Sequence, residues 1–435
     1  MSGDAADGWN LVYDEEGAPP GRIAGTAARV LAVADEWFPA RGGLSSLNRY
    51  LCGALAAAGA ETYCLVPGAS PAELADAERA GVRLVAARRS PGTTEREALM
   101  RRPPLPRGAV PDLVIGHGRV TGQIARALVE DHFPDAARLH LVHMDPDDIE
   151  WFKLDHEDDA GVRAEERGRL ELALARDAAA VMPVGPRLHA KLLRDLPDGP
   201  RLLRLDPGFD AGFDTGSAVG SDAGEPGERT APAGRPLVMI MGRLEDARLK
   251  GLELAAKAIG HAWALDPRAA DWELLVRGAP AGGEHRLREH VLDLIGHRSA
   301  NVTVRAYSPE TSVIRDDLRR ASLLLMPSLV EGYGLVGHEA IAMGIPALVS
   351  ARSGLGELIT EVAPEMAPDL VVPVRHDDAL DVPVWGHRIA AIMTDRTGAY
   401  ARAEAARSVL ARRRTWAMAA AELLGLVRAG GRSGG

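Results

Sequence analysis

Hydrophobic positions in this chain alternate between short apolar runs and longer segments with the 3.6-residue period of helices. In the first half of the chain, the apolar runs predict strands at 29–35, 61–66, 82–87, 112–116, 138–144, 179–184 and 201–205. Helical patterns separate these runs, most clearly at 44–58, 121–131, 164–176 and 186–194. Regular alternation of strands and helices predicts an α/β fold with a parallel, doubly wound sheet.

The alternation of predicted strands and helices is then interrupted, and it resumes further along the chain. Residues 211–235 are dominated by Gly, Ala, Ser, Asp and Pro, and we interpret them as a flexible linker because almost nothing there could enter a core. A second series predicts strands at 236–242, 272–278, 301–307, 322–327, 346–350 and 369–374. A chain of 435 residues is also too long for one ordinary core. We therefore expect a loose leader at 1–27, domains at 28–210 and 236–397, and a helical C-terminal segment at 398–435.

Composition narrows the class of protein. The formal net charge of −10 argues against non-specific binding to nucleic acid, which needs a basic surface. Cys52 and Cys64 lie in apolar segments, so we expect buried free thiols in a reducing compartment rather than a disulfide. The chain does not open with a signal-peptide pattern, and it has no apolar run of about 18 residues. We expect a cytoplasmic protein.

The stretch 327–346 carries the clearest chemical signal. Residues 323–326 predict a buried strand, and 335–343 predict a short helix directly after a glycine-rich turn. Glu331 lies in that turn and Glu339 lies eight positions later, in the helix. Open α/β sheets bind ligands at the carboxyl ends of their strands, and the free amides of a helix N-terminus accept phosphate or hydroxyl groups. Two carboxylates there suit a ligand that carries hydroxyls and phosphate.

A second glycine-bearing turn follows the first strand of the chain. Gly42 and Gly43 open the next helix, and we expect a positive φ there and a close approach of backbone amides to a ligand. The surrounding sequence departs from the G-x-G-x-x-G pattern, so it does not indicate a nicotinamide or flavin site. An ordinary turn between strand and helix is the alternative interpretation.

Several other polar residues follow predicted strands. His117 and His143 come at strand ends in the first domain, and Arg243 follows a strand in the second. A hydrogen-bonded structural role is the alternative for either histidine. No group of His, Cys or Asp has the spacing of metal ligands.

Together these motifs resemble the retaining GT-B glycosyltransferases of family 4. The resemblance rests on Glu331-x7-Glu339 inside Pro327-Ser328-x-x-Glu331-Gly332-x-Gly334, on Gly42-Gly43, and on Gly242-Arg243-Leu244 followed by Lys250-Gly251. It implies two Rossmann-like domains facing across a cleft. The N-terminal domain would bind the acceptor, the C-terminal domain would bind a nucleotide sugar, and the last helix would return to the first domain.

The resemblance also implies a role for each candidate residue. Glu331 would hold hydroxyls of the donor sugar, and Glu339 would hold the ribose diol. His143 would contact the donor sugar, and Arg243 and Lys250 would neutralise the leaving phosphate. The backbone amides of Gly332, Tyr333, Gly334 and Leu335 would face the sugar or phosphate, with Gly42 and Gly43 near the same phosphate. The loop before Lys250 is two residues longer than usual in the family, which makes Arg248 a rival for its role.

The implied activity is that of a retaining hexosyltransferase that needs no metal and no cofactor. Its donor would be a UDP-, GDP- or ADP-sugar, and its acceptor is left open. A non-catalytic module that binds sugar nucleotides, or an epimerase or phosphorylase of the same fold, is the alternative. We interpret the basic, proline-rich stretch 88–107 as a solvated loop, with contact to an anionic acceptor or a membrane surface as the other interpretation.

Overall fold

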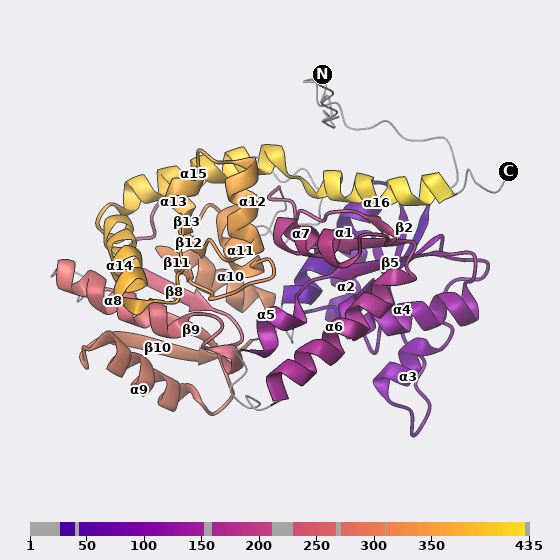
Figure 1. The fold of residues 1–435 in the computed structure, drawn as a ribbon, viewed down its shortest axis with the longest axis horizontal. Helices are drawn as coiled ribbons and strands as arrows, with labels where there is room; N and C mark the ends of the chain where they lie inside the picture. Colours follow the sequence, from indigo (N-terminus) through magenta and orange to yellow (C-terminus); the bar gives the residue numbers. More distant parts are fainter. Residues whose placement is uncertain are drawn as a thin grey trace, which may run out of the picture.

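The computed structural model describes residues 27–39, 43–151, 159–210, 229–266, 271–308 and 310–430. Two α/β halves lie side by side, each built on one parallel sheet (Figure 1). Gly42, nearly all of the predicted leader and residues 211–228 of the predicted linker lie outside the described residues. The prediction of two Rossmann-like doubly wound domains is confirmed.

The first half contains a seven-stranded sheet in the order β3-β2-β1-β4-β5-β6-β7. Its strands are β1 (Arg29–Val33), β2 (Glu61–Val66), β3 (Val82–Ala86), β4 (Leu113–His117), β5 (Ala137–Val142), β6 (Ala180–Pro183) and β7 (Arg201–Leu202). Its helices are α1 (Gly43–Ala57), α2 (Pro71–Arg79), α3 (Glu95–Met100), α4 (Gly118–His132), α5 (Pro146–Glu150), α6 (Ala160–Arg176) and α7 (Gly185–Asp195).

The second half contains a six-stranded sheet in the order β10-β9-β8-β11-β12-β13. Its strands are β8 (Leu237–Met241), β9 (Glu273–Ala279), β10 (Asn301–Ala306), β11 (Leu323–Met326), β12 (Ala347–Ser350) and β13 (Val371–Val372). The helices here are η2 (Leu244–Asp246, a short 3-10 helix), α8 (Leu252–Leu265), α9 (Glu284–Ile295), α10 (Thr311–Arg320), α11 (Leu335–Ala342), α12 (Gly354–Val362), α13 (Ala367–Leu370) and α14 (Asp378–Thr394). Two more helices, α15 (Arg396–Arg413) and α16 (Trp416–Gly430), end the described chain.

Strands β1, β8 and β11 are apolar over nearly their whole length because both faces of each sheet are covered by helices. In β1, Val30 and Ala32 pack into one apolar cluster, whereas Leu31 and Val33 pack into another on the opposite face. Alternate residues of a strand point to opposite faces, so a continuous apolar run is what this position requires.

The two C-terminal helices run from the second half of the molecule onto the first, as the yellow segment of Figure 1 shows. Trp416, the first residue of α16, is fully buried and stacks on Tyr50 of α1, with 5.6 Å between ring centroids. Its backbone amide also donates to Oδ1 of Asp210 at 2.8 Å. α16 therefore packs against the first domain.

Two local predictions were wrong. The stretch 88–107 is not simply a solvated loop, because it contains α3, whose capping residue Thr94 exchanges hydrogen bonds with Glu97 and whose Leu99 is buried. The strand predicted at 369–374 pairs only at Val371 and Val372. Part of that range forms the last turn of α13 instead.

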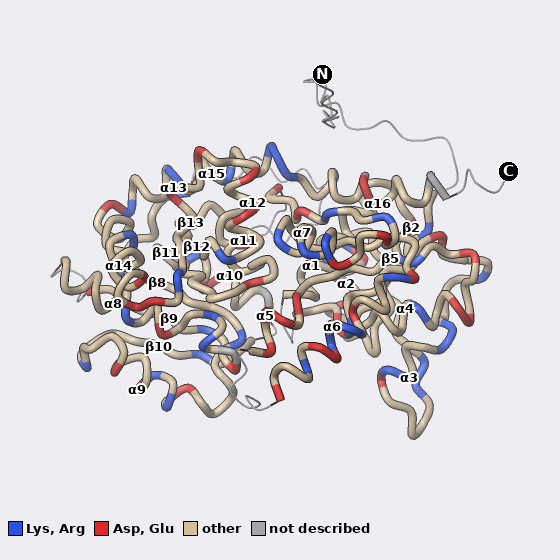
Figure 2. The backbone as a smooth tube through the Cα atoms, in the orientation of Figure 1, with Lys and Arg blue, Asp and Glu red and all other residues tan. Residues whose placement is uncertain are grey.

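Charge is distributed evenly at the level of whole domains. Acidic and basic positions are interspersed over both halves of the molecule (Figure 2). Cys52 and Cys64 are buried free thiols, as predicted. Among the helices that the structure describes, none combines the length and the apolar character needed to cross a bilayer.

Candidate active site

The candidate residues gather where the strand order of each sheet reverses. In the first sheet the reversal lies between β1 and β4, and in the second it lies between β8 and β11. Open α/β sheets bind ligands just beyond the carboxyl ends of the strands at this point. Gly43 follows β1, His117 ends β4, Arg243 follows β8 and Glu331 follows β11.

The Glu331 turn contacts the carboxyl edge of the first sheet, beside its reversal point, through backbone. A methyl group placed on Gly332 would lie 2.5 Å from the carbonyl oxygen of His143, which follows β5 in the other domain. Only a residue without a side chain permits this approach. The Glu331 turn and the His143 segment are therefore held against each other, although nearly 190 residues separate them.

Glu331 is held by a cation and a hydroxyl. Nζ of Lys250 donates to Oε2 of Glu331 at 2.7 Å, and Oγ of Ser328 donates to the same oxygen at 3.1 Å. The Lys250 loop is fixed to the Glu331 turn by a backbone hydrogen bond of 2.9 Å from the Leu329 amide to the Leu249 carbonyl. Both ionic side chains are largely buried, with exposed fractions of 24% for Lys250 and 19% for Glu331.

The other two cations of this region have different surroundings. Arg248 and Arg243 are exposed, and neither forms an ion pair with any residue that the structure describes. Lys250, rather than Arg248, is thus the cation that reaches the Glu331 carboxylate. Arg243 keeps the position predicted for it, directly after β8, with its side chain accessible.

The backbone amides of the Glu331 turn are available to a ligand. Among the described residues, none accepts a hydrogen bond from the amides of Gly332, Tyr333, Gly334 and Leu335. The side chain of Tyr333 is already engaged, since its hydroxyl forms a hydrogen bond of 2.9 Å with Nδ1 of the buried His338. Tyr333 can therefore offer its amide to a ligand, while its ring belongs to the packing between the domains.

The first-domain turn meets the second domain at Leu335. A methyl group on Gly43 would lie 2.8 Å from Cδ1 of Leu335. The expectation of a positive φ at Gly43 was wrong, because Gly43 is the first residue of α1 and is not among the described glycines with positive φ. The glycine is needed here for the close approach to Leu335 rather than for an unusual backbone conformation.

Glu339 lies inside this contact between the domains. Burial raises the pKa of its carboxyl from 4.5 to about 7, and the positive charge of Arg49 on α1 partly opposes the shift. Burial and the nearby Glu339 also raise the pKa of Tyr50. Nη2 of Arg49 forms an ion pair with Oδ2 of Asp76 at 2.7 Å, so the positive charge of Arg49 is shared between Asp76 and Glu339. Glu339 is consequently easy to protonate near neutral pH.

Behind His143 lies a chain of buried polar groups. Nε2 of His143 lies 2.9 Å from Nδ1 of His117, and Nε2 of His117 lies 2.9 Å from Oδ1 of Asn48. Burial lowers the pKa of His117 to about 3, with His140 adding to the effect, and burial together with His117 lowers the pKa of His143. Both rings are therefore neutral at pH 7.

The partners of Asn48 fix the protons along this chain. Its Nδ2 donates to the Cys64 sulfur at 3.4 Å, so its Oδ1 is the atom facing His117. An amide oxygen only accepts, which puts the His117 proton on Nε2 and leaves Nδ1 as an acceptor. Nε2 of His143 must then donate to it, and Nδ1 of His143 remains an acceptor.

Two of these neighbours could not be found from a motif. Asn48 and Arg49 lie in the middle of α1, and neither follows a strand or a glycine-rich turn. The one available signal was the amide side chain of Asn48 within a mostly apolar helix face.

Metal binding has no obvious location in the described part of the chain. No group of three or more His, Cys, Asp or Glu side chains is placed there to hold a metal ion.

A comparison with known proteins decides the family. The model of the family described as Family 4 Glycosyltransferase in conflict systems matches residues 31–423. The chain belongs to this family. The resemblance to family 4 inferred from the motifs is confirmed.

A curated relative is also similar to this chain, over a smaller part of its length. The D-inositol 3-phosphate glycosyltransferase of Salinispora arenicola is 29% identical over 164 residues, which cover 37% of this chain and 34% of that protein. The chain thus spans about a third of the length of this curated relative.

Solved structures show the same GT-B fold over nearly the whole chain. Sucrose-phosphate synthase of Thermosynechococcus elongatus superposes with a TM-score of 0.63 at 20% identity, covering 92% of this chain and 98% of the other. HepE of Anabaena, solved in complex with UDP and glucose, gives a TM-score of 0.62 at 14% identity, covering 92% and 99%.

Proposed function

We propose that this glycosyltransferase moves a hexose from a nucleotide sugar to an acceptor hydroxyl with retention of anomeric configuration and without a metal ion. The proposal rests on the family, on the two carboxylates at the β11–α11 turn, and on the cation beside one of them. The structural relative HepE was solved with UDP and glucose, which supports a nucleotide-sugar donor. The acceptor is left open.

The donor sugar would lie against the Glu331 turn. Its hydroxyls would donate to the Glu331 carboxylate, and the free amides of Gly332 to Leu335 would donate to the sugar or to the diphosphate. Glu339 would accept from the ribose diol once ionised. The Gly43 end of α1, already in contact with Leu335, would complete the same site from the first domain.

Departure of a nucleoside diphosphate builds negative charge on its β-phosphate. Lys250, which would exchange its bond to Glu331 for one to phosphate, and the accessible Arg243 would stabilise that charge. Fixed cations and helix amides can do this without Mg²⁺. By family resemblance, retention requires no protein nucleophile. The acceptor hydroxyl would attack the anomeric carbon on the face from which the phosphate leaves. The bond from that carbon to the phosphate oxygen would break, and the leaving phosphate would take the hydroxyl proton. The chain then contributes positioning and charge stabilisation.

His143 would orient the sugar from the first domain. The protons along Asn48, His117 and His143 leave Nδ1 of His143 as an acceptor, which suits a sugar hydroxyl as donor.

The observation that carries the proposal is the convergence of Lys250, Glu331 and His143 at the facing carboxyl edges of the two sheets. A panel of UDP-, GDP- and ADP-sugars tests it. One donor should raise the melting temperature and should slowly release nucleoside diphosphate in EDTA. Proton NMR of the transferred sugar should show the anomeric configuration of the donor. Tight nucleotide binding without release for any donor and acceptor would indicate a non-catalytic module instead.

A further inference from the structure

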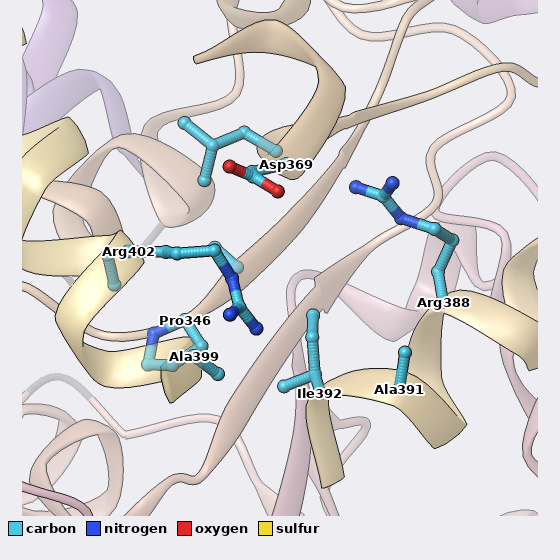
Figure 3. A pocket seen from close by; sticks show the side chains of 10 residues that line it. Pro346, Asp369, Arg388, Ala391, Ile392, Ala399 and Arg402 are labelled. Carbon is cyan, nitrogen blue, oxygen red and sulfur yellow. The ribbon is translucent and has the colours of Figure 1, made fainter. Parts of the chain in front are cut away.

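A cavity of about 240 Å³ lies in the second domain, between α13, α14 and α15 (Figure 3). Two arginines and one aspartate supply its charged groups, namely Arg388, Arg402 and Asp369. The rest of its lining consists of alanine, leucine, isoleucine and proline side chains. A space of this size is smaller than the roughly 300–1,000 Å³ of pockets for drug-sized molecules, so it suits a small ligand.

The cavity is separate from the candidate active site. Its lining includes Ala347, the first residue of β12, and Leu370, which immediately precedes β13. It therefore opens at the amino edge of the sheet, whereas Glu331 and Lys250 lie at the carboxyl edge. The four residues of β12 alone span about 13 Å between these edges.

Arg388 lacks a close counter-charge. Its half-buried guanidinium forms no ion pair or hydrogen bond with the described residues. Burial lowers its pKa, the negative charge of Asp369 opposes that effect, and the positive charge of Arg402 adds to it. A guanidinium in this position is under-neutralised, since a half-buried cation normally gains a carboxylate or phosphate partner.

Arg402 approaches the cavity from α15, on the side opposite Arg388 (Figure 3). Its one ion pair within the described chain is long, with 3.5 Å between Nη1 and Oδ2 of Asp395. The carboxylate of Asp395 is also engaged in capping α15, where it accepts from the amide of Gly398. Arg402 can thus leave this long ion pair and bind an anion in the cavity with little loss of stabilising free energy.

We propose that this cavity is a second anion-binding site, taking the phosphate group of a small phosphorylated molecule between Arg388 and Arg402. Guanidinium groups bind phosphate through paired, directional hydrogen bonds. The apolar side chains of the lining would pack against the body of the ligand. Asp369 would limit the affinity of the site for anions through its like charge.

Calorimetric titration with inorganic phosphate and with glucose 6-phosphate, at constant ionic strength, tests the assignment. Both should bind to the full-length protein, and glucose alone should not. The variants Arg388→Gln and Arg402→Gln should each weaken binding at least about tenfold. Asp369→Asn should strengthen it, because the repulsion is removed. Arg412→Gln, a change of an exposed arginine on the same helix, should leave it unchanged.

The same titration is repeated with the candidate active site saturated by a nucleoside diphosphate. Phosphate should still bind with the same affinity. Loss of phosphate binding under these conditions, equal binding of glucose and glucose 6-phosphate, or wild-type affinity in both arginine variants would overturn the proposal. Thermal unfolding of each variant checks that it is folded, and the opposite effect of Asp369→Asn keeps the test decisive if one arginine variant is unstable.

Discussion

Nζ of Lys250 and Oε2 of Glu331 are 2.7 Å apart, so the cation proposed to receive the leaving phosphate is already paired with the carboxylate proposed to hold the sugar. A donor would have to separate this pair, and each partner would then bind a different part of the same ligand. Lys250 and Glu331 therefore neutralise each other until a ligand separates them.

Replacing Lys250 by Ala should lower turnover about 10²–10³-fold, the range seen when one donor to a developing oxyanion is removed. Donor affinity should fall less, because the helix amides remain. Steady-state kinetics with the identified donor gives both values. Lys257→Ala is the matched control, since Lys257 pairs with Asp378 on α14, away from Glu331. A larger loss for Arg248→Ala than for Lys250→Ala would reverse the assignment of the two cations.

Glu339→Gln should change binding and stability in opposite directions. A charge-assisted hydrogen bond to a hydroxyl contributes about 1.5–3 kcal/mol, so donor affinity should fall roughly tenfold to a hundredfold. In the folded protein the pKa of Glu339 is raised from 4.5 to about 7, so the folded state holds a proton that the unfolded chain releases. The contribution of this group to stability therefore declines as pH rises from 4.5 towards 7.

Glutamine does not ionise, so the Glu339→Gln variant does not lose stability as pH rises from 4.5 towards 7. It should therefore be more stable than the wild type at pH 7.5. Donor titration at pH 7.5 and denaturant unfolding at pH 5 and 7.5 measure the two effects. The exposed Glu245→Gln serves as control. Unchanged donor affinity in a folded Glu339→Gln protein would remove Glu339 from the ribose site.

The two glycines at the contact between the domains should respond differently to a methyl group. At Gly43 the methyl meets the end of the flexible Leu335 side chain, which can rotate away. At Gly332 it meets the backbone carbonyl of His143, which cannot. Gly43→Ala should therefore be mild, and Gly332→Ala should reduce turnover strongly.

The larger Gly43→Val should reduce turnover, and Leu335→Ala should partly restore it in the double variant. Kinetics of the four proteins in this cycle measure the coupling. Strictly additive effects would mean that the two side chains do not meet in the working enzyme.

His117 should make the protein sensitive to acid. Its folded-state pKa is about 3, well below the 6.5 of an ordinary histidine, so stability is lost as pH falls below 6.5 and only the unfolded chain takes up the proton. Between pH 6.5 and 5 the loss should be about 2 kcal/mol. Urea unfolding of wild type and His117→Gln at pH 7 and 5 measures it. An equally steep loss in the variant would show that other groups control the acid response.

The sequence predicts most strands well but overestimates two of the four edge strands. The strand at 61–66 was predicted with its observed bounds, because β2 pairs on both sides and its whole apolar run is buried. At the edges, β7 and β13 pair for only two residues each. An apolar run looks the same whether it is paired over two residues or five, so neighbouring structure decides how much of it becomes strand.

The same limit applies to the site. Glu331 and Arg243 could be chosen from the sequence because they directly follow buried strands, and the carboxyl ends of parallel strands share one edge. Asn48 and Arg49 could not, because their contacts with His117 and Glu339 depend on the rotation of α1 and on how the two domains meet. Gly42, one of the predicted phosphate-binding residues, lies outside the described residues.

The most direct test of the account is ³¹P NMR of donor turnover by wild type, Glu331→Gln and Lys250→Ala, each with the donor selected from the nucleotide-sugar panel and with EDTA present. The account predicts steady release of nucleoside diphosphate by the wild type and a loss of at least about a hundredfold in both variants, with their melting temperatures close to that of the wild type. Equal release by all three proteins would contradict it, because the sugar would then be transferred at a site that does not include the Lys250–Glu331 pair.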